Sequence, residues 1–169
     1  MKTIVLGGGC FWCIEAVFQQ VKGVENVISG YAGGTTDNPN YSNIGDHAEV
    51  AQISYDEKVI NLEQILEIFF GVHDPTTLNF QGNDYGEQYR SIILCKDSEL
   101  ETANKAKEMA QNNWDDPIVT EIKILDKFYP AETYHQNYYN NNTSAGYCQV
   151  VINPKLDKFR NNFKKYLKD

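Results

Sequence analysis

The hydrophobic pattern of this chain predicts an α+β fold, a two-layer α/β sandwich with a ferredoxin-like core. Strand-length apolar runs alternate with amphipathic helical segments in the order β-α-β-β-α-β over residues 2–95. The chain has 169 residues, of which 41% are hydrophobic, and this is enough for one core and hardly enough for two. We therefore expect a single domain over residues 1–169, with extra helices and a long irregular C-terminal segment.

The first three strands of the core enclose one helix and one polar loop. A strand is expected at residues 2–6, and a helix at residues 13–21, where apolar side chains recur at i, i+3, i+4 and i+7. A second strand is expected near residues 24–31. A polar loop over residues 32–46 separates it from a third strand at residues 49–55.

The remaining core elements follow from capping signals and apolar spacing. Asn61 is suited to cap a helix whose apolar residues share one face, and residues 89–95 show the alternation of a strand. A capping box at residues 98–101 predicts another helix, which ends near Asn113. Residues 118–125 are expected to form an added strand.

The C-terminal part of the chain combines an irregular stretch with one amphipathic helix. Residues 126–153 show no clear periodicity, and a loop this long in a compact domain is usually functional or mobile. Apolar side chains at helical spacing then predict a C-terminal helix. Its buried face is marked by Leu156, Phe159, Phe163 and Leu167.

The first candidate for chemistry is Cys10, which follows three glycines at the end of the first expected strand. Glycine lets the backbone turn sharply and approach a ligand closely. Cys10 therefore stands just before a helix N-terminus, where free N–H groups and the positive end of the helix dipole favour an anion. We expect the pKa of the Cys10 thiol to be lowered, so that it reacts as a thiolate nucleophile.

Charge and composition exclude several classes of function. The formal net charge of −8 argues against nonspecific binding to nucleic acid or anionic membranes, which requires clustered Lys and Arg. The sequence shows neither a signal peptide nor a run of about 18 apolar residues, so we expect a cytoplasmic protein. Its four cysteines are too few for a disulfide scaffold, and a reducing compartment favours catalytic or metal-binding use.

Three further polar segments offer groups that a thiol reaction needs. Tyr41 lies in the polar loop, which ends at His47-Ala48-Glu49 where a strand begins. A glycine-punctuated segment over residues 81–89 leads into the next strand, and Gly146-Tyr147-Cys148 places a second thiol in the irregular segment. If these segments meet Cys10 at one edge of the sheet, they form one site.

Several separate motifs resemble those of the A-type peptide methionine sulfoxide reductases, in the family's order and over nearly the whole chain. They are Gly9-Cys10-Phe11-Trp12, His47-Ala48-Glu49, Gln81-Gly82-Asn83-Asp84, Gln88-Tyr89-Arg90-Ser91, His135-Gln136 and Gly146-Tyr147-Cys148. This combination is far more specific than a lone CxxC. The resemblance implies an oxidoreductase that reduces methionine-S-sulfoxide, free or in proteins, to methionine and so repairs oxidised proteins.

The resemblance also implies a role for each candidate residue. Cys10 would attack the sulfoxide sulfur, while Glu49, kept protonated by an apolar pocket, would donate a proton to the oxygen. Tyr41 and Tyr89 would hydrogen-bond that oxygen, and Asp84 would orient them or a water molecule. The S-methyl group would be held by two aromatic side chains, Phe11 and Trp12.

The implied reaction is completed by a thiol cycle. A sulfenic acid on Cys10 would condense with the Cys148 thiol to a disulfide, with loss of water. An external thiol reductant, thioredoxin or dithiothreitol, would reduce the disulfide, so no metal or organic cofactor is needed. The implied partners are oxidised proteins or peptides, free methionine sulfoxide and thioredoxin. We expect a monomer that binds neither nucleic acid nor membrane.

The sequence departs from the family pattern at three places. Cys13 stands where many relatives have glycine and forms a CxxC with Cys10, so it would resolve the sulfenic acid, relay the disulfide or only pack. We rank packing or an auxiliary relay above primary resolution. The loop between Tyr41 and Glu49 is shorter than the common form, which affects the placement of Tyr41. Phe80 replaces a frequent basic residue and would alter peptide preference.

Simpler interpretations stand beside this one. Cys95 is expected to be an inert buried thiol, and His47 and His135 are expected to be structural hydrogen-bonding groups. A general dithiol oxidoreductase would act on protein disulfides and be indifferent to Glu49→Gln. A zinc-binding module would use Cys10, Cys13, Cys148 and a histidine, although a second closely spaced pair of ligands is missing. A peptide-binding domain without catalysis is the remaining alternative.

Overall fold

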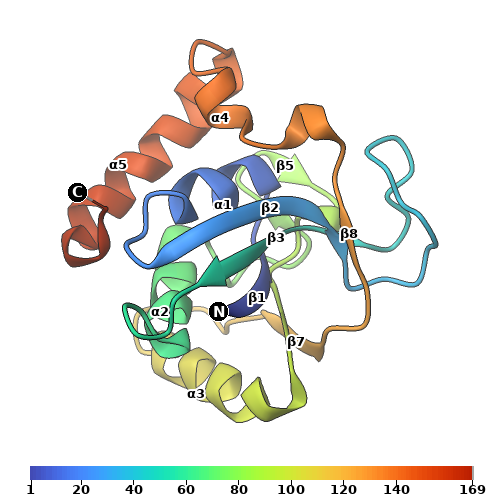
Figure 1. The fold of residues 1–169 in the computed structure, drawn as a ribbon. Coiled ribbons are helices and arrows are strands. Elements are labelled where there is room, and N and C mark those ends of the chain that lie inside the picture. Colours follow the sequence, from blue (N-terminus) through green and yellow to red (C-terminus); the bar gives the residue numbers. More distant parts are fainter. Residues whose placement is uncertain (169) are drawn as a thin grey trace.

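The computed structural model describes residues 1–168 and contains a six-stranded sheet with the order β7-β6-β1-β3-β2-β8 (Figure 1). Neighbouring strands among the central four are antiparallel. These are β6 (Ile92–Cys95), β1 (Lys2–Gly7), β3 (Ala48–Tyr55) and β2 (Val24–Ala32). The strand that comes first in the chain lies between the third and the last of them. This is the ferredoxin-like order, and the predicted α+β fold class is confirmed.

Two short strands widen the sheet at its edges. β7 (Glu121–Ile124) pairs in parallel with β6, and β8 (Phe128–Pro130) pairs antiparallel with β2. β7 is shorter than the predicted strand at residues 118–125. A separate hairpin of β4 (Phe80–Gln81) and β5 (Asp84–Tyr85) lies outside the large sheet. This hairpin carries one of the candidate site residues, Asp84.

The helices and the sheet share one main core. The longer helices are α1 (Phe11–Phe18), α2 (Leu62–Val72), α3 (Leu100–Gln111) and α5 (Asn153–Asn162). They pack with strand residues such as Ile4 and Leu6, while Val5 joins Val50 in a second cluster. Alternate residues of a strand point to opposite faces, so the helices cover one face of the sheet. No helix within residues 1–168 is both long and apolar enough to cross a membrane.

Capping interactions decide where two of these helices begin. Before α2, the Asn61 side chain accepts a hydrogen bond from the Gln64 N–H over 2.8 Å, and the Gln64 side chain accepts one from the Asn61 N–H over 3.0 Å. The predicted Asn61 cap is confirmed. The predicted capping box at residues 98–101 is wrong, because a 3-10 turn (Asp97–Glu99) precedes α3. The Glu99 carboxylate instead accepts the Lys96 N–H over 2.9 Å.

Two other element boundaries differ from the prediction. β6 begins at Ile92 rather than at residue 89, since a 3-10 turn (Glu87–Tyr89) takes up its expected start. The C-terminal helix ends at Asn162, so Phe163 and Leu167 lie beyond it and still pack against the core. Apolar spacing predicted the buried residues correctly, but the predicted helix was too long.

The stretch at residues 126–153 is more regular than predicted. After β8 it forms a 3-10 turn (Thr133–His135), the short helix α4 (Tyr138–Asn141) and a π-helical stretch (Cys148–Ile152) that continues into α5. Glu15, buried on α1, anchors it by accepting hydrogen bonds from the N–H groups of Asn137 over 2.9 Å and Tyr138 over 3.1 Å. These long-range contacts have no local sequence signature, so periodicity did not reveal the order of this segment.

Candidate active site

Cys10 lies between Gly8 and Gly9, which follow β1, and the first residue of α1. Its backbone is extended, as at a helix N-cap, and its side chain is only 7% exposed. Gly9 has a φ of 94°, and a Cβ atom there would lie 2.9 Å from Cγ of Gln81. Glycine is therefore required where the loop passes under the β4–β5 hairpin. The predicted position of Cys10 before a helix is observed.

The pKa of the Cys10 thiol is shifted in the opposite direction to the prediction. Burial raises the pKa of its thiol well above the ordinary value, and the nearby Cys13 and Glu49 raise it further. A hydrogen bond from the Trp12 N–H lowers the pKa, as expected at a helix N-terminus, but it is the smaller effect. Desolvation of the thiolate therefore outweighs the helix dipole. Without substrate, Cys10 is held as a thiol.

Glu49 comes from β3 and reaches the start of α1. Its side chain is 1% exposed, and its carboxylate accepts hydrogen bonds from the Phe11 N–H over 3.2 Å and from Nε2 of Gln88 over 2.8 Å. Burial raises the pKa of Glu49 to about 7, although these two hydrogen bonds act in the opposite direction. A carboxyl group with this pKa can both give and take a proton near neutral pH.

Aromatic side chains at the start of α1, which directly follow Cys10 in the chain, pack against residues of the C-terminal segment. Trp12 is partly buried and stacks on Tyr138, with ring centroids 3.7 Å apart and an interplanar angle of 8°. Its indole Nε1–H donates to Nδ1 of His135 over 3.2 Å. The ring of Phe11, which is fully buried, lies 5.1 Å from the His135 ring and 6.5 Å from the Tyr41 ring. Of the two residues predicted to hold the methyl group, only Trp12 has exposed surface.

The two predicted tyrosines lie on separate loops near this aromatic group. Tyr41 is 40% exposed, with its ring 4.4 Å from that of His135, and its N–H donates to the Glu132 carboxylate over 3.0 Å. Tyr89 is half-buried, and its carbonyl oxygen accepts the N–H of Gly9 over 3.2 Å. Burial and the neighbouring Glu49 carboxyl group raise the pKa of both phenols, which keeps them neutral hydrogen-bond donors.

Asp84 reaches the thiols through another tyrosine. Its carboxylate accepts a hydrogen bond from the Tyr147 hydroxyl over 2.8 Å, and this hydroxyl lies 3.7 Å from Sγ of Cys13. Because the phenol proton is given to Asp84, the Cys13 thiol is the donor to the phenol oxygen. The predicted residue Asp84 therefore belongs to the site, on the side of Cys13.

The four cysteines differ in their relation to the site. Cys13 follows Cys10 by one helical turn, and its N–H donates to the Cys10 carbonyl oxygen over 3.0 Å. Cys148 is 0% exposed at the start of the π-helical stretch, and within residues 1–168 it has no hydrogen bond to either thiol. Burial raises the pKa of Cys95 to about 11, and its Sγ lies 3.8 Å from the carbonyl oxygen of Lys123. Cys95 is a buried thiol on β6, as predicted.

Three residues of the site were not assigned a part in it from the sequence. Gln88 and Tyr147 lie within recognised motifs, but only the fold shows that they contact Glu49 and Asp84. His135 was expected to be structural, and its Nδ1 does accept the indole N–H of Trp12, while its buried Nε2 has no partner within residues 1–168. No local pattern predicts such contacts, because the partners lie far apart along the chain.

Other arrangements that the sequence suggested are absent from the described part of the chain. Residues 1–168 bring together no group of three or more side chains that could hold a metal ion.

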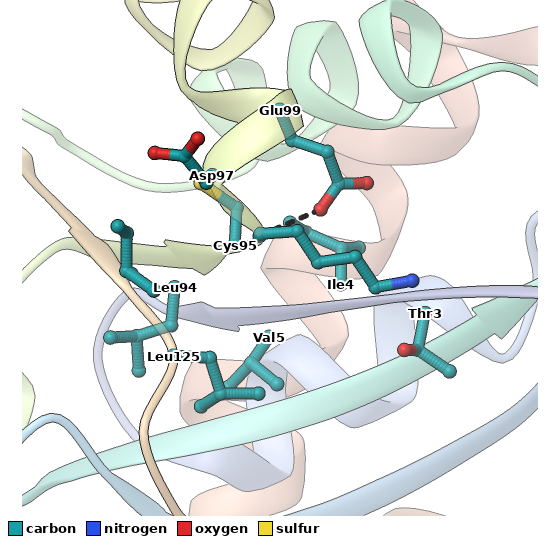
Figure 2. A pocket seen from close by; sticks show the side chains of 10 residues that line it. Thr3, Ile4, Val5, Leu94, Cys95, Asp97, Glu99 and Leu125 are labelled. Carbon is teal, nitrogen blue, oxygen red and sulfur yellow. Dashed lines mark hydrogen bonds between the residues drawn. The ribbon is translucent and has the colours of Figure 1, made fainter.

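A cavity of about 310 Å³ lies beside the first half of β1, lined by residues that include Thr3, Val5, Leu94 and Leu125 (Figure 2). None of the residues of the candidate active site lines this cavity, so it does not contribute to the site.

Comparison with known sequences agrees with the motifs. A family described as Peptide methionine sulfoxide reductase matches residues 2–167. A relative from Leptospira borgpetersenii, named Peptide methionine sulfoxide reductase MsrA, is 53% identical over 164 residues, which cover 94% of this chain and 93% of the relative. The similarity therefore extends over almost the whole chain.

Solved structures show the same relationship in three dimensions. Mxr1 from Saccharomyces cerevisiae in its reduced form superimposes with a TM-score of 0.80 and 38% identity, over 87% of this chain and 88% of that chain. The same yeast protein in complex with Trx2 gives a TM-score of 0.58 and 31% identity, over 81% of this chain and 84% of that chain. The present chain belongs to the peptide methionine sulfoxide reductase family, and it is an oxidoreductase that acts on sulfur groups.

Proposed function

We propose that this enzyme reduces methionine-S-sulfoxide, free or in proteins, to methionine by thiol chemistry at Cys10. The observation that carries the proposal is the buried Glu49 carboxyl group, which is hydrogen-bonded to the N–H of the residue after Cys10. A sulfoxide sulfur is a poor electrophile, so its reduction requires a nucleophile at sulfur together with a proton at oxygen. Cys10 and Glu49 supply these two groups from adjacent positions.

The proposed first step conserves atoms and charge. Cys10 loses its thiol proton and bonds to the sulfoxide sulfur, while Glu49 donates a proton to the oxygen. The oxygen is transferred as hydroxyl to the Cys10 sulfur, methionine leaves, and the thiol proton restores the Glu49 carboxylic acid. The sum is a thiol plus a sulfoxide giving a sulfenic acid plus a thioether. A Glu49 pKa of about 7 suits a group that gives and regains a proton in one cycle.

The remaining predicted residues have supporting roles in the proposal. The phenols of Tyr41 and Tyr89 donate hydrogen bonds to the sulfoxide oxygen as negative charge develops on it. Asp84 orients the hydroxyl group of Tyr147 near the thiols. The methyl group contacts Trp12, which is the partly exposed aromatic side chain beside Cys10.

Resolution of the sulfenic acid is assigned to Cys148. Its thiol attacks the Cys10 sulfenic acid, a disulfide forms and water leaves. Cys148 is fully buried at the start of the π-helical stretch and is a free thiol in this structure, so the step must bring its sulfur within bonding distance of Cys10. Cys13 is the second candidate, because it lies one helical turn from Cys10.

The disulfide is then reduced by an external dithiol, for which thioredoxin is the proposed partner. The likeness to yeast Mxr1 in complex with Trx2 supports this assignment. Thiol exchange supplies the two electrons, so the cycle uses neither a metal nor an organic cofactor.

The test uses the separated S and R epimers of N-acetylmethionine sulfoxide with dithiothreitol, and chromatography measures the N-acetylmethionine formed. We expect consumption of the S epimer alone, and none by Cys10→Ser. If neither epimer yields N-acetylmethionine, the reductase proposal is wrong and a general dithiol oxidoreductase takes its place. Activity on protein disulfides that survives Glu49→Gln would support that alternative.

A further inference from the structure

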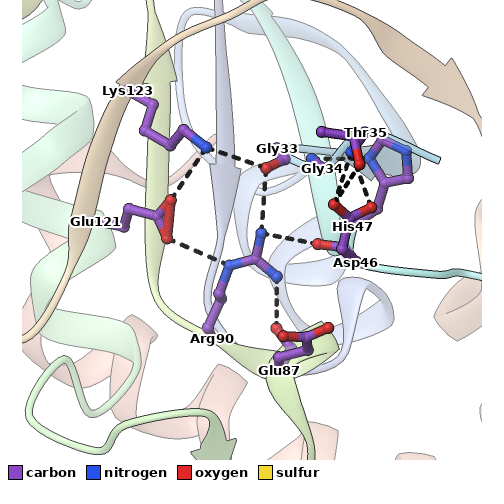
Figure 3. Close-up of polar contacts among 9 residues, drawn as sticks. All are labelled: Gly33, Gly34, Thr35, Asp46, His47, Glu87, Arg90, Glu121 and Lys123. Carbon is purple, nitrogen blue, oxygen red and sulfur yellow. Dashed lines mark hydrogen bonds and ion pairs between the residues drawn. The ribbon is translucent and has the colours of Figure 1, made fainter.

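Arg90 follows the turn at Glu87–Tyr89, and its guanidinium group joins this turn to three other segments (Figure 3). Nη1 donates to the carbonyl oxygen of Glu87 over 2.8 Å. Nη2 donates to the carbonyl oxygens of Asp46 over 3.1 Å and Gly33 over 3.3 Å. Nε lies 3.4 Å from the carboxylate of Glu121 on β7, and the Arg90 side chain is 13% exposed. All three guanidinium nitrogens therefore have partners.

Two of these partners are close in sequence to Glu49 and Gln88, whose side chains are hydrogen-bonded to each other. Asp46 precedes Glu49 by three residues, and Glu87 immediately precedes Gln88. Nε2 of Gln88 donates to the Glu49 carboxylate over 2.8 Å. Arg90 thus ties together the backbone on both sides of the Gln88–Glu49 hydrogen bond.

Hydrogen bonds connect the two ends of the loop that leads to Glu49. The Asp46 carboxylate accepts hydrogen bonds from the N–H of Thr35 over 2.8 Å and from the N–H of Thr36 over 3.0 Å. Nδ1 of His47 accepts the N–H of Gly34 over 3.0 Å, so its Nε2–H donates to the carbonyl oxygen of Thr36 over 2.6 Å. The two ends of the loop are therefore joined, and Arg90 binds a carbonyl oxygen at each end.

We propose that Arg90 is a positioning residue for the Glu49 acid, acting by holding the Gln88 amide against the Glu49 carboxylate. This inference rests on the proposed function of Glu49 as proton donor. Arginine suits the role because its planar fork binds several carbonyl oxygens in fixed directions, whereas a lysine ammonium is a single flexible point charge. Replacing Arg90 by Lys keeps the charge but loses the fork, so Gln88 no longer has a fixed position.

A change in the pKa of Glu49 can be assigned to Gln88 because Arg90 does not act on the other ionisable groups that face Glu49. The ionisable groups around it are Cys10, Cys13, Tyr31, Tyr41, Asp84 and Tyr89. The three phenols and two thiols have raised pKa values and carry no charge near pH 7. Asp84 lies on β5, and within residues 1–168 Arg90 makes no hydrogen bond or ion pair with that hairpin.

The test measures the single-turnover rate of methionine formation against pH. The Gln88 hydrogen bond lowers the pKa of Glu49, so its loss raises that pKa. We expect Arg90→Lys to lower the rate roughly tenfold, which is less than the 10²–10⁴-fold expected for loss of an acid. The alkaline limb of the pH–rate profile, where the rate falls as Glu49 loses its proton, should move to higher pH. Gln88→Ala should do the same, and the double variant should shift the limb no further than Gln88→Ala alone.

A neighbouring cation serves as the matched control. Nζ of Lys123 donates to the Gly33 carbonyl oxygen over 3.3 Å and lies 3.5 Å from the Glu121 carboxylate, but it makes no hydrogen bond to Asp46 or Glu87. Lys123→Met should therefore leave the pH profile unchanged. If Arg90→Lys fails to fold, Glu121→Ala removes one anchor of Arg90 and should give a smaller shift of the same sign.

The outcomes separate this inference from the proposed function. If Glu49→Gln abolishes the alkaline limb but Arg90→Lys and Glu121→Ala leave it in place, Arg90 is not a positioning residue. A full additional shift in the double variant with Gln88→Ala has the same meaning. If instead Glu49→Gln keeps an active enzyme with an unchanged limb, the acid role of Glu49 is wrong, and with it the inference.

Discussion

The backbone N–H of Phe11 donates a hydrogen bond to the Glu49 carboxylate over 3.2 Å. These residues are separated by 38 positions, and the contact joins the start of α1 to β3. Because Phe11 directly follows Cys10, the hydrogen bond fixes the carboxyl group beside the thiol. It also limits the rise in the pKa of Glu49, which burial alone would take further.

The first prediction concerns Glu49 as an acid. Glu49→Gln keeps the shape and the acceptor for the Phe11 N–H but cannot donate a carboxylic proton. We expect the single-turnover rate at pH 6 to fall by about 10²–10⁴-fold. In the wild type the rate should decline as the pH rises through about 7, because Glu49 then loses its proton. A variant that turns over at the wild-type rate would contradict this role.

The second prediction concerns the resting state of Cys10. Burial and the charge of Glu49 raise the pKa of its thiol, so iodoacetamide should modify it slowly at pH 7 and faster above pH 9. Glu49→Gln removes the neighbouring charge and should move this reaction to lower pH. Peptide mass spectrometry assigns the rate to Cys10. Rapid modification at pH 6 in the wild type would show that the thiol is already ionised.

The third prediction separates the two candidate resolving thiols. Without reductant, Cys148→Ser should form one methionine per Cys10 and leave a sulfenic acid that dimedone traps, because the first step does not use Cys148. Cys13→Ser is the matched control and should form the Cys10–Cys148 disulfide. A disulfide between Cys10 and Cys13 in the Cys148→Ser protein would assign resolution to Cys13.

The fourth prediction concerns His73, which is buried behind Gly8. Its Nδ1–H donates to the Phe69 carbonyl oxygen over 2.6 Å, and its Nε2 accepts the Ser91 hydroxyl over 2.7 Å. Burial lowers its pKa to about 4, from 6.5. As the pH falls below 6.5 the unfolded chain binds a proton that the folded protein excludes, so stability decreases.

This linkage amounts to up to about 3 kcal/mol of unfolding free energy between pH 6.5 and 4. Urea unfolding of the wild type and of His73→Gln at pH 7, 5.5 and 4.5 measures it. The wild type should lose more stability than the variant as the pH falls, because glutamine does not titrate. Parallel pH dependences in the two proteins would mean that folding does not lower the pKa of His73.

Local patterns predicted the parts of the fold that depend on neighbours in sequence. Alternation and helical spacing located β1, β2, β3 and α2, and the Asn61 cap follows from the residue type and its position. The capping box at residues 98–101 failed because a 3-10 turn places Glu99, rather than Ser98, at the N-cap of α3. Hydrogen bonds to Glu15 hold the start of α4, and the sequence around residue 137 contains no pattern that predicts them.

The sequence by itself determined the family, the fold class, and the presence of Cys10 at a strand-to-helix turn, because motifs and periodicity are local properties of the chain. Only the tertiary structure decided the direction in which the pKa values of Cys10 and Glu49 are shifted. Desolvation raises the pKa of Cys10 against the helix dipole and brings that of Glu49 to about 7. Both effects depend on what packs around a group, and the contacts of Gln88, Tyr147 and Arg90 come from segments that meet only in the folded protein.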